Sequence, residues 1–319
     1  MAEKNRRKTK TTRLRVQLLW AAVTNGHIWG WFSGKIYRGK LKQVCVPGMN
    51  CYSCPGALGS CPIGAMQAVI GRKAGRIPFY VAGFLMMIGA LVGRLVCGFL
   101  CPFGLIQDLL HKIPAPLKIR RLPGEKLLVK LKYVILIVFV IILPMFLVND
   151  LGNGNPYFCK LICPVGTLEG GIPLVISSQT VRNALGFLFA WKSVILTVTI
   201  ILSVMIYRPF CKFICPLGAI YSLFNKVSLY HYELNREKCI RCGRCAGVCQ
   251  MNVDPVKDAN HLECIRCGKC AESCPVQAIS KRFGLHKKGV SDRMQPKEIP
   301  QSQWNREITK PLDRIGDEL

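Results

Sequence analysis

The residues best suited to chemistry in this sequence are its cysteines, which number 18 among 319 residues. Eight of them form two runs, at 239–249 and 264–274, with the spacing C-x2-C-x2-C-x3-C. This spacing is typical of a domain that holds two [4Fe–4S] clusters, because three thiolates of a run wrap one cubane and the fourth reaches the other cluster. The predicted ligands of cluster I are Cys239, Cys242, Cys245 and Cys274, and those of cluster II are Cys264, Cys267, Cys270 and Cys249.

Zinc is the alternative occupant of closely spaced cysteines. Zinc sites usually show two C-x2-C pairs, whereas each run here has four evenly spaced thiols. One departure from the cluster pattern is that Gln250, rather than proline, follows Cys249, and the proline is delayed to Pro255. This change loosens a turn but removes no ligand. We therefore expect a small α+β domain of the bacterial ferredoxin type over residues 231–281.

Six further cysteines form three C-x3-C-P pairs, and each pair continues as C-P-x-G. The pairs are Cys97/Cys101, Cys159/Cys163 and Cys211/Cys215. A fourth C-P-x-G motif begins at Cys61 and has Cys51 and Cys54 upstream. A C-x3-C spacing places two thiols one helical turn apart on the same face, so each pair can offer two ligands to one site.

The pair Cys97/Cys101 repeats as Cys211/Cys215 with an offset of 114 residues, which also matches Arg94 with Arg208. The repeat predicts two copies of one helical hairpin, about 16–113 and 130–227, around a pseudo-twofold axis along the membrane normal. Arg94 and Arg208 each precede a cysteine by three residues and are placed to offset the charge of an anionic cluster. The candidate inner site comprises Cys97, Cys101, Cys211 and Cys215, and the candidate outer site comprises Cys159, Cys163, Cys61 and Cys54 (or Cys51).

Three interpretations of these membrane cysteines stay open from the residues alone. They hold one or two further iron–sulfur clusters, they are redox-active or metal-binding thiols (copper or disulfides), or they are buried structural thiols. Cys45 and one of Cys51 and Cys54 are left without a site.

The elements that must position these cysteines include four apolar stretches. A helix that crosses about 30 Å of hydrocarbon needs about 20 residues, and each stretch is close to that length. We therefore expect an α-helical membrane protein with four transmembrane helices, and an even number returns the C-terminus to the side of the N-terminus. The stretches are Val16–Gly34, Ile77–Gly93, Tyr133–Asn149 and Leu185–Tyr207.

The net charge of +27 in a chain that is 50% hydrophobic fits a membrane protein better than a nucleic-acid-binding protein. Residues 1–15 and 106–132 each carry seven Lys or Arg, which places both, and the two termini, in the cytoplasm. Segment 34–76 opposes this topology, because it also carries seven basic residues and no acid. Either the first span does not fully cross, or this loop folds as a unit and escapes the bias.

The predicted organisation is therefore a basic cytoplasmic N-terminus, a four-helix transmembrane domain, the two-cluster domain and a polar, disordered tail. The chain is expected in the cell membrane (plasma or inner membrane) as a multi-pass protein. The boundaries are 1–15, 16–230, 231–281 and 282–319.

The combination of four spans, C-x3-C-P pairs and a two-cluster domain resembles the NapH-type membrane ferredoxins, the C-terminal half of NosR and the FixG/RdxA/CcoG proteins, with NapH closest. The resemblance covers about residues 16–281, and the first loop is richer in cysteine than the family pattern. It implies an electron-transfer subunit, rather than a stand-alone enzyme, that works with membrane lipid, a quinone or quinol and a partner redox protein. The likeness to CcoG allows a second function, which is copper reduction or redox sensing during assembly of another enzyme.

Overall fold

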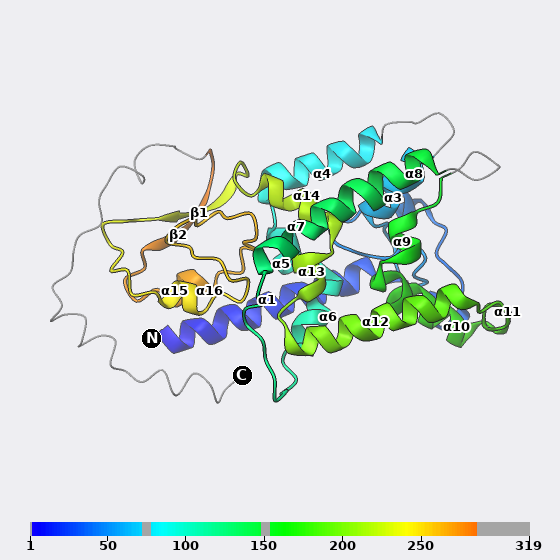
Figure 1. Ribbon diagram of the computed structural model, residues 1–319, viewed down its shortest axis with the longest axis horizontal. Helices are drawn as coiled ribbons and strands as arrows, with labels where there is room; N and C mark the ends of the chain where they lie inside the picture. Colours follow the sequence, from blue (N-terminus) through cyan, green and yellow to red (C-terminus); the bar gives the residue numbers. More distant parts are fainter. Residues whose placement is uncertain (1, 72–77, 148–153, 286–319) are drawn as a thin grey trace.

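The computed structural model describes residues 2–71, 78–147 and 154–285. It is mostly helical, and one small antiparallel sheet lies at one end of its long axis (Figure 1). The predicted tail, 282–319, lies outside the described residues from residue 286 onward. The longer helices are α1 (Ala2–Thr24), α3 (Pro62–Ile70), α4 (Phe79–Val92), α6 (Pro102–Leu110), α7 (Glu125–Ile135), α12 (Phe187–Met205) and α14 (Pro216–Phe224).

Short helical elements connect these helices. They are α2 (Ile28–Ser33), the 3₁₀ turn η1 (Lys40–Gln43), α5 (Leu95–Phe99), the π-helix η2 (Leu136–Ile142), α8 (Leu143–Phe146), α9 (Tyr157–Leu161), the π-helix η3 (Gly166–Gly171), α10 (Ile172–Ser177), α11 (Gln179–Asn183) and α13 (Pro209–Phe213). The C-terminal module contains β1 (Tyr230–Leu234), α15 (Arg244–Gly247), α16 (Lys269–Glu272) and β2 (Ile279–Phe283).

Two helices among the described residues are long and apolar enough to cross a membrane. One is the continuous helix α7–η2–α8, which spans Glu125–Phe146, and the other is α12. Both expose large apolar side chains, and so does α4, whose Phe79 is 76% exposed. Soluble monomers rarely expose large contiguous apolar patches, so these exposed apolar side chains fit contact with lipid.

The other two predicted spans are shorter than expected. Helix α4 has 14 residues, and the apolar stretch from Val16 is divided, because α1 ends at Thr24 and α2 begins only at Ile28. The residues between them include Asn25 and Gly26, which favour turns over helix. Four complete crossings therefore stay a prediction.

The C-P-x-G motifs start helices. Cys61, Cys101 and Cys215 are the N-cap residues of α3, α6 and α14, and a proline follows each at the first helical position. Proline suits that position because its missing N–H would have no helical partner, and it holds the preceding residue extended. The thiol of the N-cap cysteine therefore lies beside the free N–H groups of the first turn.

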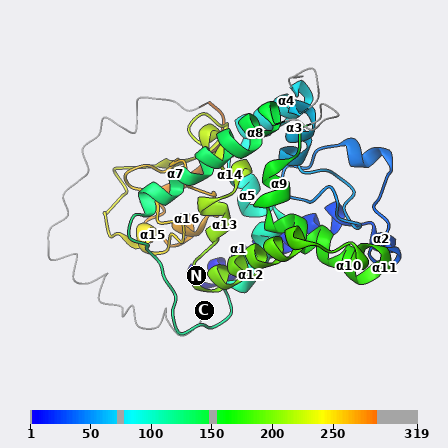
Figure 2. The same ribbon diagram turned by 45° about the vertical axis from the view of Figure 1, so that its right-hand side comes forward.

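The helices that carry these motifs pack into one core. Helix α14 contacts α4 and α7, and α12 contacts α6 and α13. Figure 2 shows the same bundle turned by 45°, with the start of α1 beside the C-terminal module.

In the C-terminal module, β1 pairs antiparallel with β2, from Tyr230 opposite Phe283 to Leu234 opposite Ile279. The module has its own small core, which includes Tyr232 and Ala278.

Candidate iron-sulfur sites

The cysteine runs of the C-terminal module fold into two sets. One pocket is lined by the four cysteines predicted for cluster I, which are Cys239, Cys242, Cys245 and Cys274. In the second set, Cys264 and Cys270 each lie within electrostatic range of Cys267 and Cys249. The fourth cysteine of each run thus lies with the other run, as the spacing predicts.

Burial raises the pKa of thiols in both sets. It raises the pKa of Cys245 to about 11 and that of Cys264 to about 12. Both thiols are therefore protonated at neutral pH, and a metal cluster that binds them as thiolates releases their protons. Among the described residues, no group of three or more His, Cys, Asp or Glu side chains is arranged around a single metal ion.

The candidate inner site brings together all four predicted cysteines. Cys215 lies within electrostatic range of Cys97, Cys101 and Cys211, and all four are buried. The side chain of Gln107 donates from Nε2 to Cys211 Sγ at 3.1 Å. These sulfurs therefore lie in a dry site that already has a hydrogen-bond donor.

Arg94 and Arg208 contact the inner site in a reciprocal way. Arg94 Nη2 donates to the carbonyl of Cys211 at 3.3 Å, and Arg208 Nη1 donates to the carbonyl of Cys97. Each arginine thus crosses to the cysteine of the other repeat. A Cβ added at Gly104 would lie 3.1 Å from Arg208 Nη1, so the glycine of C-P-x-G makes room for the guanidinium. Both arginines are fully buried.

The acids that pair with the two arginines come from different parts of the chain. Arg208 pairs with Asp108 on α6, which also pairs with Arg13 at 2.7 Å. Arg94 pairs instead with Glu263 of the C-terminal module, at 2.6 Å. The arginines of the two repeats therefore make equivalent contacts at the inner site, but the acids that pair with them lie in different parts of the chain.

In the candidate outer site, the structure places Cys51 rather than the predicted Cys54 beside the other three cysteines. One pocket is lined by Cys51, Cys61, Cys159 and Cys163. Cys54 is fully buried elsewhere, with its Sγ 3.8 Å from Asn25 Oδ1. Glu169 fixes the loop in this register, because its carboxylate accepts a hydrogen bond from the backbone N–H of Cys51 at 2.8 Å.

Sequence reasoning missed a buried polar residue six positions after each C-P-x-G cysteine. Gln107 contacts the inner site, and Gln67 donates from Nε2 to Cys159 Sγ at 3.4 Å in the outer site. Glu169 fixes Cys51, and the hydroxyl of Tyr221 donates to the carbonyl of Pro47 at 3.0 Å. The six-residue spacing is present in the sequence. Glutamine, glutamate and tyrosine differ too much in chemistry, however, for the sequence alone to indicate that these positions are equivalent.

A short segment and one tyrosine connect the two membrane sites. The backbone amide of Met49 interacts with the thiol of Cys101 in the inner site. The next amide, that of Asn50, interacts with the thiol of Cys61 in the outer site. Tyr221 is fully buried and lies within electrostatic range of Cys97 and Cys61. The inner and outer sites are therefore neighbours inside one core.

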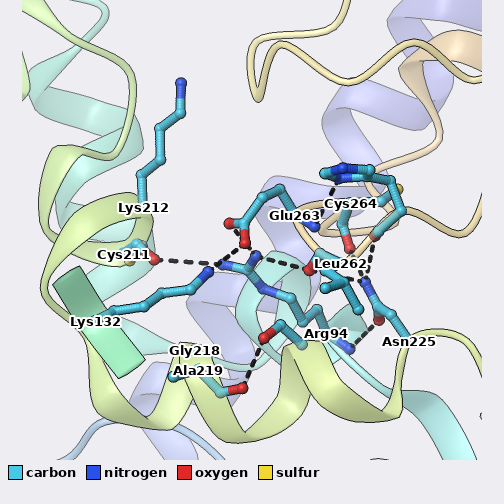
Figure 3. A network of polar contacts seen from close by, with 12 residues as sticks. Arg94, Lys132, Cys211, Lys212, Gly218, Ala219, Asn225, Leu262, Glu263 and Cys264 are labelled. Carbon is cyan, nitrogen blue, oxygen red and sulfur yellow. Dashed lines mark hydrogen bonds and ion pairs between the residues drawn. The ribbon is translucent and has the colours of Figure 1, made fainter. Parts of the chain in front are cut away.

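The C-terminal module (231–281, the ferredoxin module) docks on the membrane part (16–230) through the loop before Cys264. Glu263 pairs with Arg94 and, at 2.5 Å, with Lys132 (Figure 3). Asn225, at the end of α14, donates from Nδ2 to the carbonyl of Cys264 at 2.8 Å. Arg94 thus touches both the inner site and the loop that carries the cluster II cysteines.

Comparisons with known proteins find two matching families. A family described as a 4Fe-4S binding domain matches the membrane part at residues 60–79, 78–123, 131–172 and 188–231. A second family with the same description matches residues 232–253 and 260–280. Together the two matches cover more than half of the chain, which therefore belongs to the proteins with 4Fe-4S binding domains. It carries several 4Fe-4S binding domains, both in the membrane part and in the ferredoxin module (231–281).

Curated relatives are similar to only part of this chain. An uncharacterised protein of Methanocaldococcus jannaschii (MJ0750) is 28% identical over 53% of this chain and 63% of its own length. The putative electron transport protein YccM of Escherichia coli is 27% identical over 62% of this chain and 55% of its own length. The regulatory protein NosR of Stutzerimonas stutzeri is 25% identical over 52% of this chain and 21% of its own length.

The chain therefore spans less than two thirds of the length of these relatives. The expected membership of the family that includes NosR is confirmed, and a closer likeness to NapH stays a prediction. No solved structure matches the chain.

Proposed function

We propose that the chain is a multi-pass membrane protein that relays electrons between a quinone, or a partner on the outer face, and the cytoplasmic ferredoxin module. The observation that carries this proposal is that the thiol sites are neighbours arranged in series. Tyr221 and the amides of Met49 and Asn50 join the outer site to the inner site. Arg94 joins the inner site to the cluster II loop. Each bound [4Fe–4S] cluster would supply a one-electron carrier.

The residues around the membrane cysteines suit anionic clusters. Cys97, Cys101, Cys211 and Cys215 are the proposed inner ligands, and Cys51, Cys61, Cys159 and Cys163 the proposed outer ligands. Four thiolates bring more negative charge than a cubane offsets, so buried cations and N–H donors are needed nearby. Arg94, Arg208 and Gln107 supply them at the inner site, and Gln67 does so at the outer site.

The membrane arrangement supports the same function. In the proposed topology α1, α4, α7–α8 and α12 are the four spans, and the N-terminus and the ferredoxin module lie together in the cytoplasm. Figure 1 shows the start of α1 at the end of the molecule that holds the module. A hydrocarbon layer of about 30 Å is wide for one electron-tunnelling step. Intermediate carriers at the inner and outer sites would divide that distance.

Vesicle electron transfer tests the proposal. The protein is reconstituted in liposomes with a quinol inside and an acceptor outside, and the rate of acceptor reduction is measured. Cys97→Ser should abolish transfer, while Cys54→Ser, a buried cysteine outside all four sets, should leave the rate close to that of the wild type. No quinol-dependent transfer in the wild type, together with tight copper binding that Cys159→Ser removes, would replace this function with metal handling.

A further inference from the structure

The two cysteine runs of the ferredoxin module repeat one local sequence and backbone conformation. They align at an offset of 25 residues, which matches Arg241 with Arg266 and Gly243 with Gly268. The backbone agrees, because both arginines adopt the left-handed region, at φ 50° and 54°, and so do the glycines, at 73° and 88°. The backbone therefore has the same local conformation at equivalent positions of the two runs, so equivalent side chains start from it in the same local orientation.

On the cluster II run, this surface docks the membrane part. Arg266 is 1% exposed and donates to the carbonyls of Val92 at 3.0 Å and Asn225 at 2.7 Å, at the C-terminal ends of α4 and α14. A guanidinium is favourable there because the carbonyls at a helix C-terminus carry partial negative charge. Glu263 adds the buried pairs with Arg94 and Lys132.

On the cluster I run, the equivalent side chains are exposed. Arg241 stands in the position of Arg266, and Lys238 stands in the position of Glu263. Arg244 is also exposed, and Glu237 is the one acid between residues 236 and 245. The same docking geometry is therefore repeated with its acidic residue replaced by a basic one.

We propose that Lys238, Arg241 and Arg244, the cluster I surface, dock an acidic electron-transfer protein. The membrane part meets Glu263 with two cations, so the partner of the cluster I surface should meet Lys238 with carboxylates. Arg241 would bind a carboxylate or the carbonyl end of a helix. This inference rests on the relay function proposed above. The cysteines that line the cluster I pocket would hold a one-electron carrier; it would exchange one electron with the partner's own redox group, one being oxidised and the other reduced, with no bond made or broken.

The position of this surface favours a protein over a lipid headgroup. Cys249 and Cys267 of cluster II pack against the main core that continues into the membrane part. Cys239, Cys245 and Cys274 of cluster I belong to the separate small core of the module, which Cys270 of cluster II also contacts. The membrane part contacts the cluster I run at Gly247, whose carbonyl accepts a hydrogen bond from Arg120, but it leaves Lys238, Arg241 and Arg244 exposed.

The test measures binding of an acidic flavodoxin to the full, cluster-loaded chain in nanodiscs of neutral lipid. The variant Lys238→Glu with Arg241→Glu should raise the Kd at least about tenfold at low salt, and wild-type binding should weaken as salt rises. The matched control, Lys112→Glu with Lys226→Glu, makes the same charge change at two exposed positions of the membrane part and should leave the Kd unchanged.

Electron-transfer rates distinguish two outcomes, which are that the proposed docking at the cluster I surface is wrong and that the proposed relay function is wrong. The double variant at the cluster I surface should slow transfer to flavodoxin and not to menadione, an uncharged quinone. If wild-type protein reduces neither acceptor, the relay function fails and the docking inference fails with it. If both are reduced, and the charge reversal changes neither the Kd nor the flavodoxin rate, only the docking inference is wrong. Loss of binding to anionic vesicles with flavodoxin binding intact would assign the surface to lipid and overturn it.

Discussion

Replacing Glu263 with glutamine should release the ferredoxin module from the membrane part. Burial by itself raises the pKa of Glu263, but Arg94 and Lys132 outweigh it and lower the pKa, so the carboxylate is ionised at neutral pH. The pairs measure 2.6 and 2.5 Å, and the side chains of both cations are fully buried. The substitution keeps the shape of the side chain and leaves two buried cations without a counter-charge.

The expected cost follows from that burial. Removing one partner of a buried ion pair destabilises a structure by about 3–5 kcal/mol. An exposed pair contributes about 0–1 kcal/mol, so Glu233→Gln is a matched control. Glu233 pairs with Arg282 at 2.8 Å within the module, and their side chains are 33% and 66% exposed.

Hydrogen exchange in residues 258–266 reports this opening directly. A loss of 3–5 kcal/mol corresponds to about 100- to 4,000-fold faster exchange where local opening limits the rate. Glu233→Gln should change exchange less than about fivefold. Iron content should be equal in all three proteins, which separates undocking from loss of a cluster. Exchange in the Glu263→Gln variant within threefold of wild type would refute the proposed role of this triad.

Three further predictions concern the membrane sites. Cys51→Ser should lower the iron content by about four atoms per chain while Cys54→Ser leaves it unchanged, because only Cys51 lines the outer pocket; equal losses would reject this ligand set. Gln107→Leu should lower the potential of the inner cluster by about 20–60 mV in a redox titration, because the loss of about one hydrogen bond to sulfur disfavours the reduced state, and the exposed Gln179→Leu should not shift it. Burial raises the pKa of Asp108, but Arg208 and Arg13 lower it below the ordinary value, so its ion pairs stabilise the fold above about pH 4 and are lost as the pH falls further. Asp108→Asn should therefore cost about 3 kcal/mol in denaturant unfolding at pH 7, and a deficit that persists undiminished at acid pH would contradict this assignment.

The grouping of the ferredoxin cysteines can be predicted from the sequence because its geometry is local. Three cysteines within seven residues must wrap one centre, and only the exchange of the fourth cysteine needs the fold. The inner set was also accessible, because the 114-residue offset relates Cys97 to Cys211 and Arg94 to Arg208.

The choice between Cys51 and Cys54 was not accessible. Both lie in the same irregular loop, and the choice depends on Glu169, more than 100 residues away. The partner of Arg94 could not be predicted either, because it also lies far away in the sequence. Asp108 follows the inner motif of its own hairpin, but Glu263 belongs to another module, and no local pattern connects it to Arg94. The apolar stretch from Val16 to Gly34 also overstated the first span, because mean hydropathy does not register the turn at Asn25 and Gly26.

The most direct test of the account is the iron and acid-labile sulfide content of the purified full-length protein. Four cubane sites predict about sixteen irons and sixteen sulfides per chain. Cys97→Ser and Cys159→Ser should each remove about four of both. A content of about eight irons, unchanged by either substitution, would mean that only the ferredoxin module holds clusters and would contradict the proposed series of four.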